Sequence, residues 1–198
     1  IYKSQMYDLN HLAKHMRTAS LKNKDATFIQ VHENDQLISF EDFFQNAEKI
    51  ASALIYAGIK PGDRVAMQVE KSSSALELYF GTILAGASIL PLNTAYVTEE
   101  ISFFLHDAQP FIFVCDPAKL ENFTKISKSN EVHHLWTLSA DGTGTLFDAK
   151  NAESSGFSGI KRDPDDLAAV LYTSGTTGRS KGAMLTQRNL QSNAETLV

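Results

Sequence analysis

Residues 167–185 read LAAVLYTSGTTGRSKGAML: an apolar run, a polar loop and a second short apolar run. The loop, 173–182, contains three glycines, several hydroxyl side chains and one lysine. Glycines let backbone N–H groups turn inward to form an anion-binding nest, hydroxyls add donors, and lysine adds a flexible positive charge. The stretch therefore predicts a strand, a phosphate-binding loop and a second strand, and it points to nucleotide chemistry.

The residues of this loop are the candidate site. The Walker-type phosphate loop is excluded because Ser180, not glycine, precedes Lys181, and glycine rather than a hydroxyl residue follows it. A glycine- and threonine-rich surface hairpin without a ligand is the other interpretation, and the joint order, composition and length favour the phosphate loop. We expect ligand contacts from Thr173, Ser174, Gly175, Thr176, Thr177, Gly178, Lys181 and Gly182.

The rest of the chain alternates between helical and extended patterns. The clearest helix starts at Ser39, which forms a capping-box-like pair with Asp42, and stops at Gly58. Strands separated by helices of this length predict βαβ units on a mostly parallel sheet, an α/β fold. The expected strands are 64–69, 88–92, 111–115, 133–138 and 167–171; the expected helices are 40–57, 73–85, 98–108, 118–128 and 187–198.

The patterning also divides the chain. Residues 1–138 form the N-terminal α/β subdomain, and 139–166 form a long connection in which regular periodicity is lost. Residues 167–198 then carry the strand, the phosphate loop and a closing helix that Thr186 caps, as the start of an incomplete unit. Met6 is a possible native start.

Composition excludes several classes of function. The 198 residues are 43% hydrophobic and 21% charged with a net charge of −5, so a basic nucleic-acid surface is not expected. The longest apolar stretch, 78–92, is interrupted and too short to span a bilayer as a helix, and no secretory signal is visible. The single cysteine, Cys115, lies in an apolar run and is expected to be a buried small hydrophobe. A cytoplasmic location follows as the default.

The loop resembles the signature motif of the adenylate-forming superfamily, which includes acyl-CoA synthetases, luciferases and the adenylation domains of peptide synthetases. Residues 172–182 match the motif in order and type, except that Ser180 stands where proline is usual. Loss of proline's fixed φ loosens the loop locally but removes neither a donor nor the charge.

This resemblance implies a reaction and its cofactors. Family enzymes use ATP and Mg²⁺ to form an acyl-adenylate from a carboxylate, release pyrophosphate, and transfer the acyl group to coenzyme A. Lys181 and the loop N–H groups would stabilise the departing pyrophosphate. The resemblance covers the N-terminal part of such an enzyme, and it puts the magnesium ligand and the catalytic lysine beyond Val198. The 198 residues alone are therefore expected to be inactive.

Four shorter segments resemble one branch, the malonyl-CoA synthetases. They are residues 69–72, 90–96, 114–117 and 178–181. The substrate implied by this resemblance is malonate, and the cation that would bind its second carboxylate is expected beyond Val198. A fatty acyl-CoA ligase of the same superfamily and a non-catalytic binding module that retains the fold remain as alternatives. The sequence leaves the oligomeric state open.

The histidines and Ser174 offer weaker hypotheses. His11 and His15 have helical metal-chelating spacing, but no third ligand is evident, and solvated positions on a helix are favoured. His133 and His134 are adjacent on an expected strand and should point to opposite faces. Ser174 lacks the flanking motif of a hydrolase nucleophile. No metal site is predicted within the chain.

Overall fold

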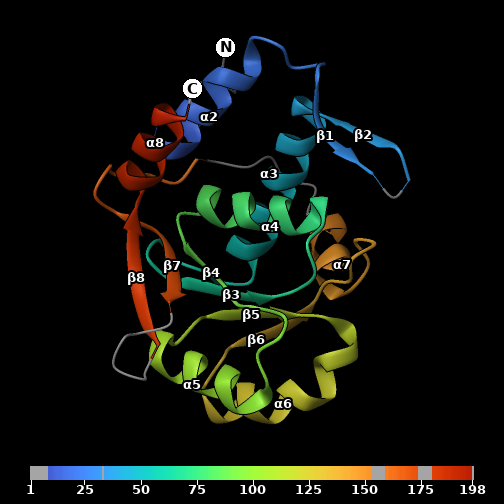
Figure 1. Cartoon of the computed structure of the whole chain (residues 1–198), viewed down its shortest axis with the longest axis vertical. Helices are drawn as coiled ribbons and strands as arrows, with labels where there is room; N and C mark the ends of the chain where they lie inside the picture. The colour runs from blue at the N-terminus through green and yellow to red at the C-terminus, as the bar shows by residue number, and fades with distance from the viewer. Residues whose placement is uncertain (1–8, 33, 153–158, 174–179, 198) are drawn as a thin grey trace.

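A computed structural model describes residues 9–32, 34–152, 159–173 and 180–197, and its centre is a six-stranded sheet with the spatial order β6-β5-β3-β4-β7-β8 (Figure 1). All neighbouring strands pair in parallel except β7 and β8, which are antiparallel. The α/β class with a mostly parallel sheet is confirmed. The strands are β3 (Arg64–Gln68), β4 (Ser88–Pro91), β5 (Ile112–Cys115), β6 (His134–Thr137), β7 (Leu167–Thr173) and β8 (Lys181–Thr186).

Helices cover both faces of this sheet, as Figure 1 shows. On one face α3 (Phe40–Tyr56) and α4 (Ser73–Leu84) pack with Val65, Ile89 and Ile112 of the strands. On the other face α5 (Thr98–Ala108) and α6 (Leu120–Ser129) pack with a second set that includes Leu90 and Phe113. All four residues of β5 are buried, which explains why its sequence is an uninterrupted apolar run.

Local signals place the ends of these elements. The Ser39 hydroxyl accepts a hydrogen bond from the Asp42 N–H (3.1 Å) at the start of α3, and Gly58 follows the helix with φ of +97°. The Thr186 hydroxyl caps α8 (Gln187–Thr196) by accepting from the Asn189 N–H. These three caps confirm the sequence predictions. No helix in the described part of the chain has the length and apolarity needed to cross a bilayer.

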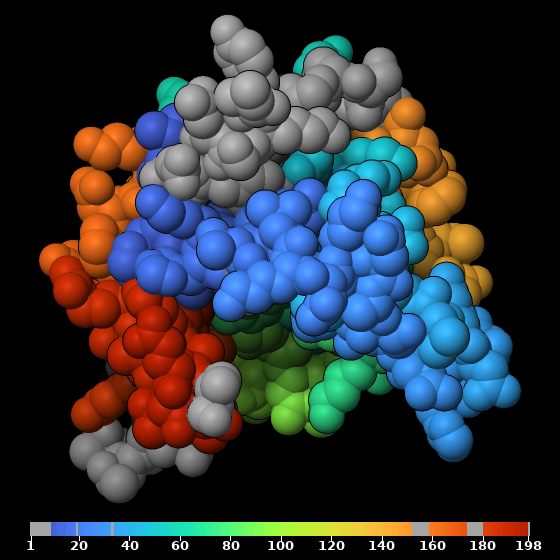
Figure 2. Space-filling model, turned by 90° about the horizontal axis from the view of Figure 1, so that it is seen from above, coloured from blue at the N-terminus to red at the C-terminus, as the bar shows by residue number. Residues whose placement is uncertain are grey.

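Three elements on the N-terminal side had no bounds assigned from the sequence. A hairpin of β1 (Thr27–Val31) and β2 (Gln36–Ser39) precedes α3, and the Phe28 ring lies 4.9 Å from that of Phe43. Helix α2 (His11–Leu21) packs against α8, so the first and last described helices lie side by side (Figure 2). The buried Gln187 side chain accepts a hydrogen bond from the Leu12 N–H (2.8 Å) and joins the two helices.

The expected connection 139–166 contains a helix that periodicity did not reveal. Helix α7 (Thr145–Ala152) packs against α3 and buries Leu146 in the core. Its first residue, Thr145, accepts a hydrogen bond from the Thr137 N–H (2.9 Å) at the end of β6. The division of the chain at 138 and 167 stays a prediction, while β7 itself lies beside β4 in the single large sheet. Met6 lies outside the described residues.

Helices α3 and α4 approach each other closely at Gly81. A β-carbon at this position would lie 2.7 Å from Ile50 Cγ2 and 2.9 Å from the Ala47 carbonyl oxygen. Both distances are far inside van der Waals contact, and the carbonyl belongs to the helix backbone, so relief requires the helices to separate. Glycine at 81 therefore allows the close packing of α3 and α4 on this face of the sheet.

Gly81→Ala should lower the free energy of unfolding by about 1 to 2 kcal/mol, because overpacking outweighs the better helix propensity of alanine. The measurement is chemical denaturation followed by circular dichroism. Leu76→Ala is the matched control on the same helix, since Leu76 is 52% exposed and should matter less. A Gly81→Ala protein as stable as the unmodified one would contradict the close approach.

Candidate nucleotide-binding site

The predicted loop joins β7 to β8 as a hairpin connection at one end of the sheet. Thr173 pairs with Lys181, and Tyr172 pairs with Gly182, in the last two steps of the antiparallel register. The hairpin thus brings Thr173 and Lys181, eight positions apart in sequence, opposite each other where the loop begins and ends. The other predicted site residues lie outside the described residues: Ser174, Gly175, Thr176, Thr177 and Gly178.

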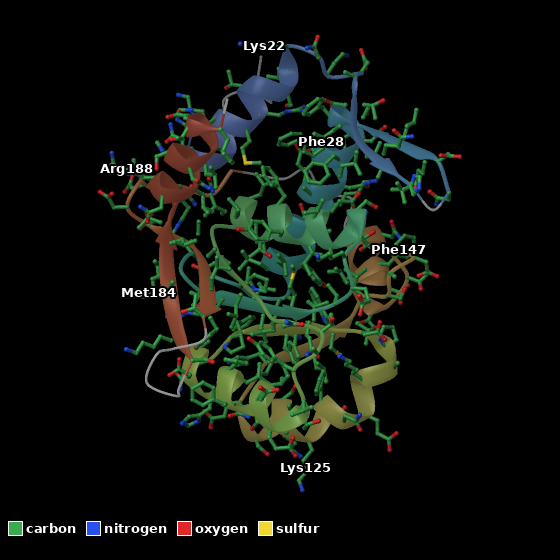
Figure 3. The ribbon with its side chains drawn as sticks, in the orientation of Figure 1. Lys22, Phe28, Lys125, Phe147, Met184 and Arg188 are labelled. Atoms are coloured by element: carbon green, nitrogen blue, oxygen red, sulfur yellow. The ribbon has the colours of Figure 1, made fainter. Side chains whose placement is uncertain are left out.

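Lys181 is exposed at this position. Within the described part of the chain, no carboxylate lies within ion-pair distance of its ammonium group. The charge is therefore available to an anionic ligand. Farther along β8, Met184 is 65% exposed and points away from the sheet (Figure 3).

Gly182 lies at a tightly packed position, and its backbone is not left-handed. A β-carbon there would lie 3.1 Å from Val170 Cγ1 and 3.4 Å from Tyr172 Cζ. The missing side chain leaves room for the Tyr172 ring to lie across the hairpin. Among the predicted site glycines, this is the one whose role the described residues reveal.

Tyr172, one residue before the loop, is anchored on α5. Its ring lies 4.5 Å from the Phe104 ring between centroids, and its hydroxyl donates a hydrogen bond to the Asp107 carboxylate. Burial, and then the hydrogen bond to Asp107, raise the pKa of the Tyr172 phenol above its usual value. The phenol therefore stays protonated and remains a donor at neutral pH.

A buried polar network lies at the same edge of the sheet, and its centre is Gln68, the last residue of β3. The Gln68 side chain is fully buried, and its Nε2 donates to the carbonyl oxygens of Asn93 (2.8 Å) and Tyr96 (3.0 Å). Lys119 Nζ donates to the Thr94 carbonyl oxygen (2.7 Å) and to Gln68 Oε1 (3.3 Å). Sequence reasoning missed Gln68; the signal was a lone amide at the end of an apolar strand.

Three of the sequence segments that resemble malonyl-CoA synthetases lie close to this network in the fold. The segments 69–72, 90–96 and 114–117 follow or end β3, β4 and β5, and the loop follows β7. Because these strands are parallel, their carboxyl ends share one edge, where ligands of open α/β sheets commonly bind. The segments that follow β3, β4 and β5 and the end of β7 at Thr173 are thus gathered at that edge.

A separate pocket of about 870 Å³ lies between α3, α4, α7 and the β1–β2 hairpin. A buried ion pair stands within it: Lys150 Nζ is 3.0 Å from Glu77 Oε2, and Asn46 Nδ2 donates to the other carboxylate oxygen (2.8 Å). Of the predicted loop residues that the structure describes, Thr173, Lys181 and Gly182, none lines this pocket. The ion pair serves the packing of α4 against α7 and α3.

The four histidines singled out from the sequence lie on α2 and at or just before the start of β6. His11 is half-buried and hydrogen-bonds to Gln191 of α8, while His15 is exposed. His133 and His134 both contact the Phe111 ring, so the prediction of opposite faces is wrong; β6 begins only at His134, and strand alternation does not extend to His133. Within the described ranges no three His, Cys, Asp or Glu side chains gather as metal ligands.

Comparison with known proteins agrees with this geometry. A family model for AMP-binding enzymes matches residues 16–198, and the chain therefore belongs to that family. ATP-bound MatB from Rhodopseudomonas palustris superposes with a TM-score of 0.89 at 44% identity, over 96% of this chain and 37% of MatB. The fold is thus that of the N-terminal portion of adenylate-forming enzymes.

Two curated plant relatives match over shorter spans. The "Probable CoA ligase CCL9" of Humulus lupulus is 35% identical over 151 residues, which are 74% of this chain and 29% of the relative. The oxalate–CoA ligase of Arabidopsis thaliana is 35% identical over 156 residues, 76% of this chain and 30% of the relative. The chain therefore spans about three-tenths of the length of these relatives.

Cys115, at the end of β5, is buried as expected from the sequence. Burial raises the pKa of its thiol to about 12; the neighbouring Asp116 charge adds to the shift, and Lys119 partly opposes it. The thiolate is the reactive form, so at pH 8 Cys115 should resist alkylation in the folded protein. Mass spectrometry of the Cys115 peptide after iodoacetamide treatment measures this, with guanidinium-unfolded protein as the control. Equal labelling in both states would contradict the burial.

Proposed function

We propose that the full-length protein carrying this chain is an ATP-dependent, AMP-forming acyl-CoA synthetase. The single observation that carries the proposal is the β7–β8 hairpin, whose register sets Thr173 opposite Lys181 at the two ends of the signature loop. Membership of the AMP-binding family supports it, and so does the match to an ATP-bound structure.

The proposed chemistry has two steps. A substrate carboxylate oxygen attacks the α-phosphorus of ATP, the bond to the β-phosphate oxygen breaks, and pyrophosphate leaves. The sulfur of coenzyme A then attacks the acyl carbon, AMP departs, and the thiol proton is lost. A carboxylate needs this activation because its negative charge repels nucleophiles and its oxide is a poor leaving group.

The part of this chain in the first step is electrostatic. Negative charge accumulates on pyrophosphate as it departs, and fixed donors aimed at that charge lower the barrier. Lys181, whose ammonium lacks a carboxylate partner among the described residues, would supply the positive charge. Thr173 and the loop N–H groups would supply hydrogen-bond donors, while Mg²⁺ would further neutralise the phosphates through ligands expected beyond Val198.

Malonate is the proposed substrate. Support comes from the four segments that resemble malonyl-CoA synthetases, three of which follow or end neighbouring strands at the carboxyl edge of the sheet. The 35% identity to an oxalate–CoA ligase, a relative named for another short dicarboxylate, also favours this chemical class. A fatty acyl-CoA ligase of the same superfamily is the alternative.

Lys181→Ala in the full-length protein should slow ATP–pyrophosphate exchange about a hundredfold, the usual range for removing a transition-state charge contact. Thioester formation from preformed acyl-adenylate should fall far less, since pyrophosphate has already left. Thr176→Ala should act in the same direction. Lys125→Ala is the control, because that exposed lysine on α6 points into solvent away from the hairpin (Figure 3). Equal losses in both half-reactions would argue for a structural role of Lys181.

The substrate proposal predicts that thioester formation with malonate exceeds that with acetate and with a long-chain fatty acid. A site that holds a second carboxylate contains a cation, and an apolar tail would leave that cation buried and unpaired. Side-by-side assays of the three acids with saturating ATP and coenzyme A measure this. Preference for the fatty acid would favour the ligase alternative, and nucleotide binding without exchange on any carboxylate would favour a binding module.

A further inference from the structure

The end of β7 is paired with β8, but on its β4 side it has little strand pairing to hold its position. On its β4 side the recorded register is a single pair, Ile89 with Ala169, supplemented by the Ser88 hydroxyl donating to the Leu167 carbonyl oxygen (3.2 Å). Thr173, at the start of the phosphate loop, lies four residues beyond that pair. On this side, side-chain contacts must fix the last residues of β7 before the loop.

Tyr172 makes those contacts from the residue before Thr173. Its ring lies 4.5 Å from the Phe104 ring of α5 between centroids, and it also lies beside Gly182, where a β-carbon would come within 3.4 Å of its Cζ. Its hydroxyl reaches the Asp107 carboxylate, three residues after Phe104 on the same side of the helix. One side chain of α5 thus supports the ring, and another fixes its polar end.

Helix α5 is a firm base for this contact. Ile101, Phe104 and Leu105 are buried in the core, and the Tyr96 ring lies 4.9 Å from Phe104. The Tyr96 backbone is in turn held by the Gln68 amide. Contacts therefore run without interruption from the centre of the sheet to Tyr172.

Asp107 is unfavourably placed for the helix itself. It lies in the last turn of α5, where the helix dipole disfavours negative charge. Arg64 offsets this in part, because its Nη1 donates to the Ala108 carbonyl oxygen (2.8 Å) at the same helix end. Asp107 is exposed, so the core does not require it. The hydrogen bond from Tyr172 is therefore the interaction that explains an acidic residue at this position.

We propose that Asp107 is a positioning residue for adenylation: by accepting the Tyr172 hydrogen bond, it fixes the end of β7 and so the start of the phosphate loop. The inference rests on the proposed function. Asp107 contacts neither substrate nor reacting atoms in this scheme. Its effect passes through Tyr172 to Thr173, and it should influence ATP more than coenzyme A.

The test uses the full-length protein and measures both half-reactions. Tyr172→Phe keeps the ring and removes the hydroxyl, and Asp107→Ala removes the acceptor. Each should raise KM for ATP in pyrophosphate exchange about fivefold, the effect of losing one modest hydrogen bond. Thioester formation from preformed acyl-adenylate and the melting temperature should stay unchanged.

Two further variants separate positioning from general damage. Asp107→Asn retains an acceptor oxygen and should restore most of the ATP affinity. The double variant Tyr172→Phe/Asp107→Ala should be no worse than either single variant, because both remove the same contact. His106→Ala, which changes the neighbouring exposed residue of α5, is the control and should leave KM for ATP unaltered.

The possible failures are distinct. An unmodified protein that exchanges pyrophosphate, combined with an Asp107→Ala variant of unchanged KM for ATP, would overturn the positioning role alone. Additive losses in the double variant, or equal losses in both half-reactions, would also overturn it. Absence of exchange by the unmodified protein with every carboxylate would overturn the proposed function and the positioning role with it.

Discussion

Burial of the central strands on both faces is the constraint on which the rest of the structure depends. Strands β3, β4 and β5 lie between two helical layers, so their backbone polar groups must be satisfied within the sheet. Parallel pairing meets that requirement, and each crossover then needs a helix. The arrangement brings the carboxyl ends of β3, β4, β5 and β7 to one edge. Polar residues that the core cannot hold are gathered there.

Gln68 is the polar side chain that this arrangement does bury. An amide at the end of a central strand is costly unless its groups are paired, and here both a donor and an acceptor of the side chain are used. The result is a fixed path for residues 93–96 and a fixed start for α5. The buried Gln68 side chain thus helps to position α5, the helix that contacts Tyr172, although Gln68 is remote from Tyr172 in sequence.

The β7–β8 hairpin has to meet two conflicting requirements: a loop suited to a ligand and strand ends that hold their position. In the proposed function, its loop presents backbone N–H groups and a lysine to a charged ligand, which favours glycine and hydroxyl residues over bulky ones. Small and polar side chains offer little apolar surface to bury, so contacts outside the loop have to hold the strand ends. The structure resolves the conflict just outside the loop, where Tyr172 packs on Phe104 and Gly182 leaves the space that the ring needs.

Some features of the structure left little trace in the sequence, and the reasons are physical. The strand β1 has no fully buried residue, so it lacks the alternation that identifies a half-buried strand. Helix α7 has eight residues, and its core contact is carried by Leu146, too short a pattern for helical periodicity to stand out. Short elements of this kind are stabilised by the surfaces they cover rather than by their own propensities.

The sequence by itself determined the α/β class, the order of the main helices and strands, and the caps at Ser39, Gly58 and Thr186, and it predicts the chemistry of the loop. These features depend on local periodicity and on the backbone preferences of single residues. Only the tertiary structure decided three contacts: Gln68 hydrogen-bonds to the 93–96 backbone, α3 packs closely over Gly81, and Tyr172 hydrogen-bonds to Asp107. Such contacts join residues far apart in the chain, and they exist only once strand register and helix packing have brought their side chains within reach.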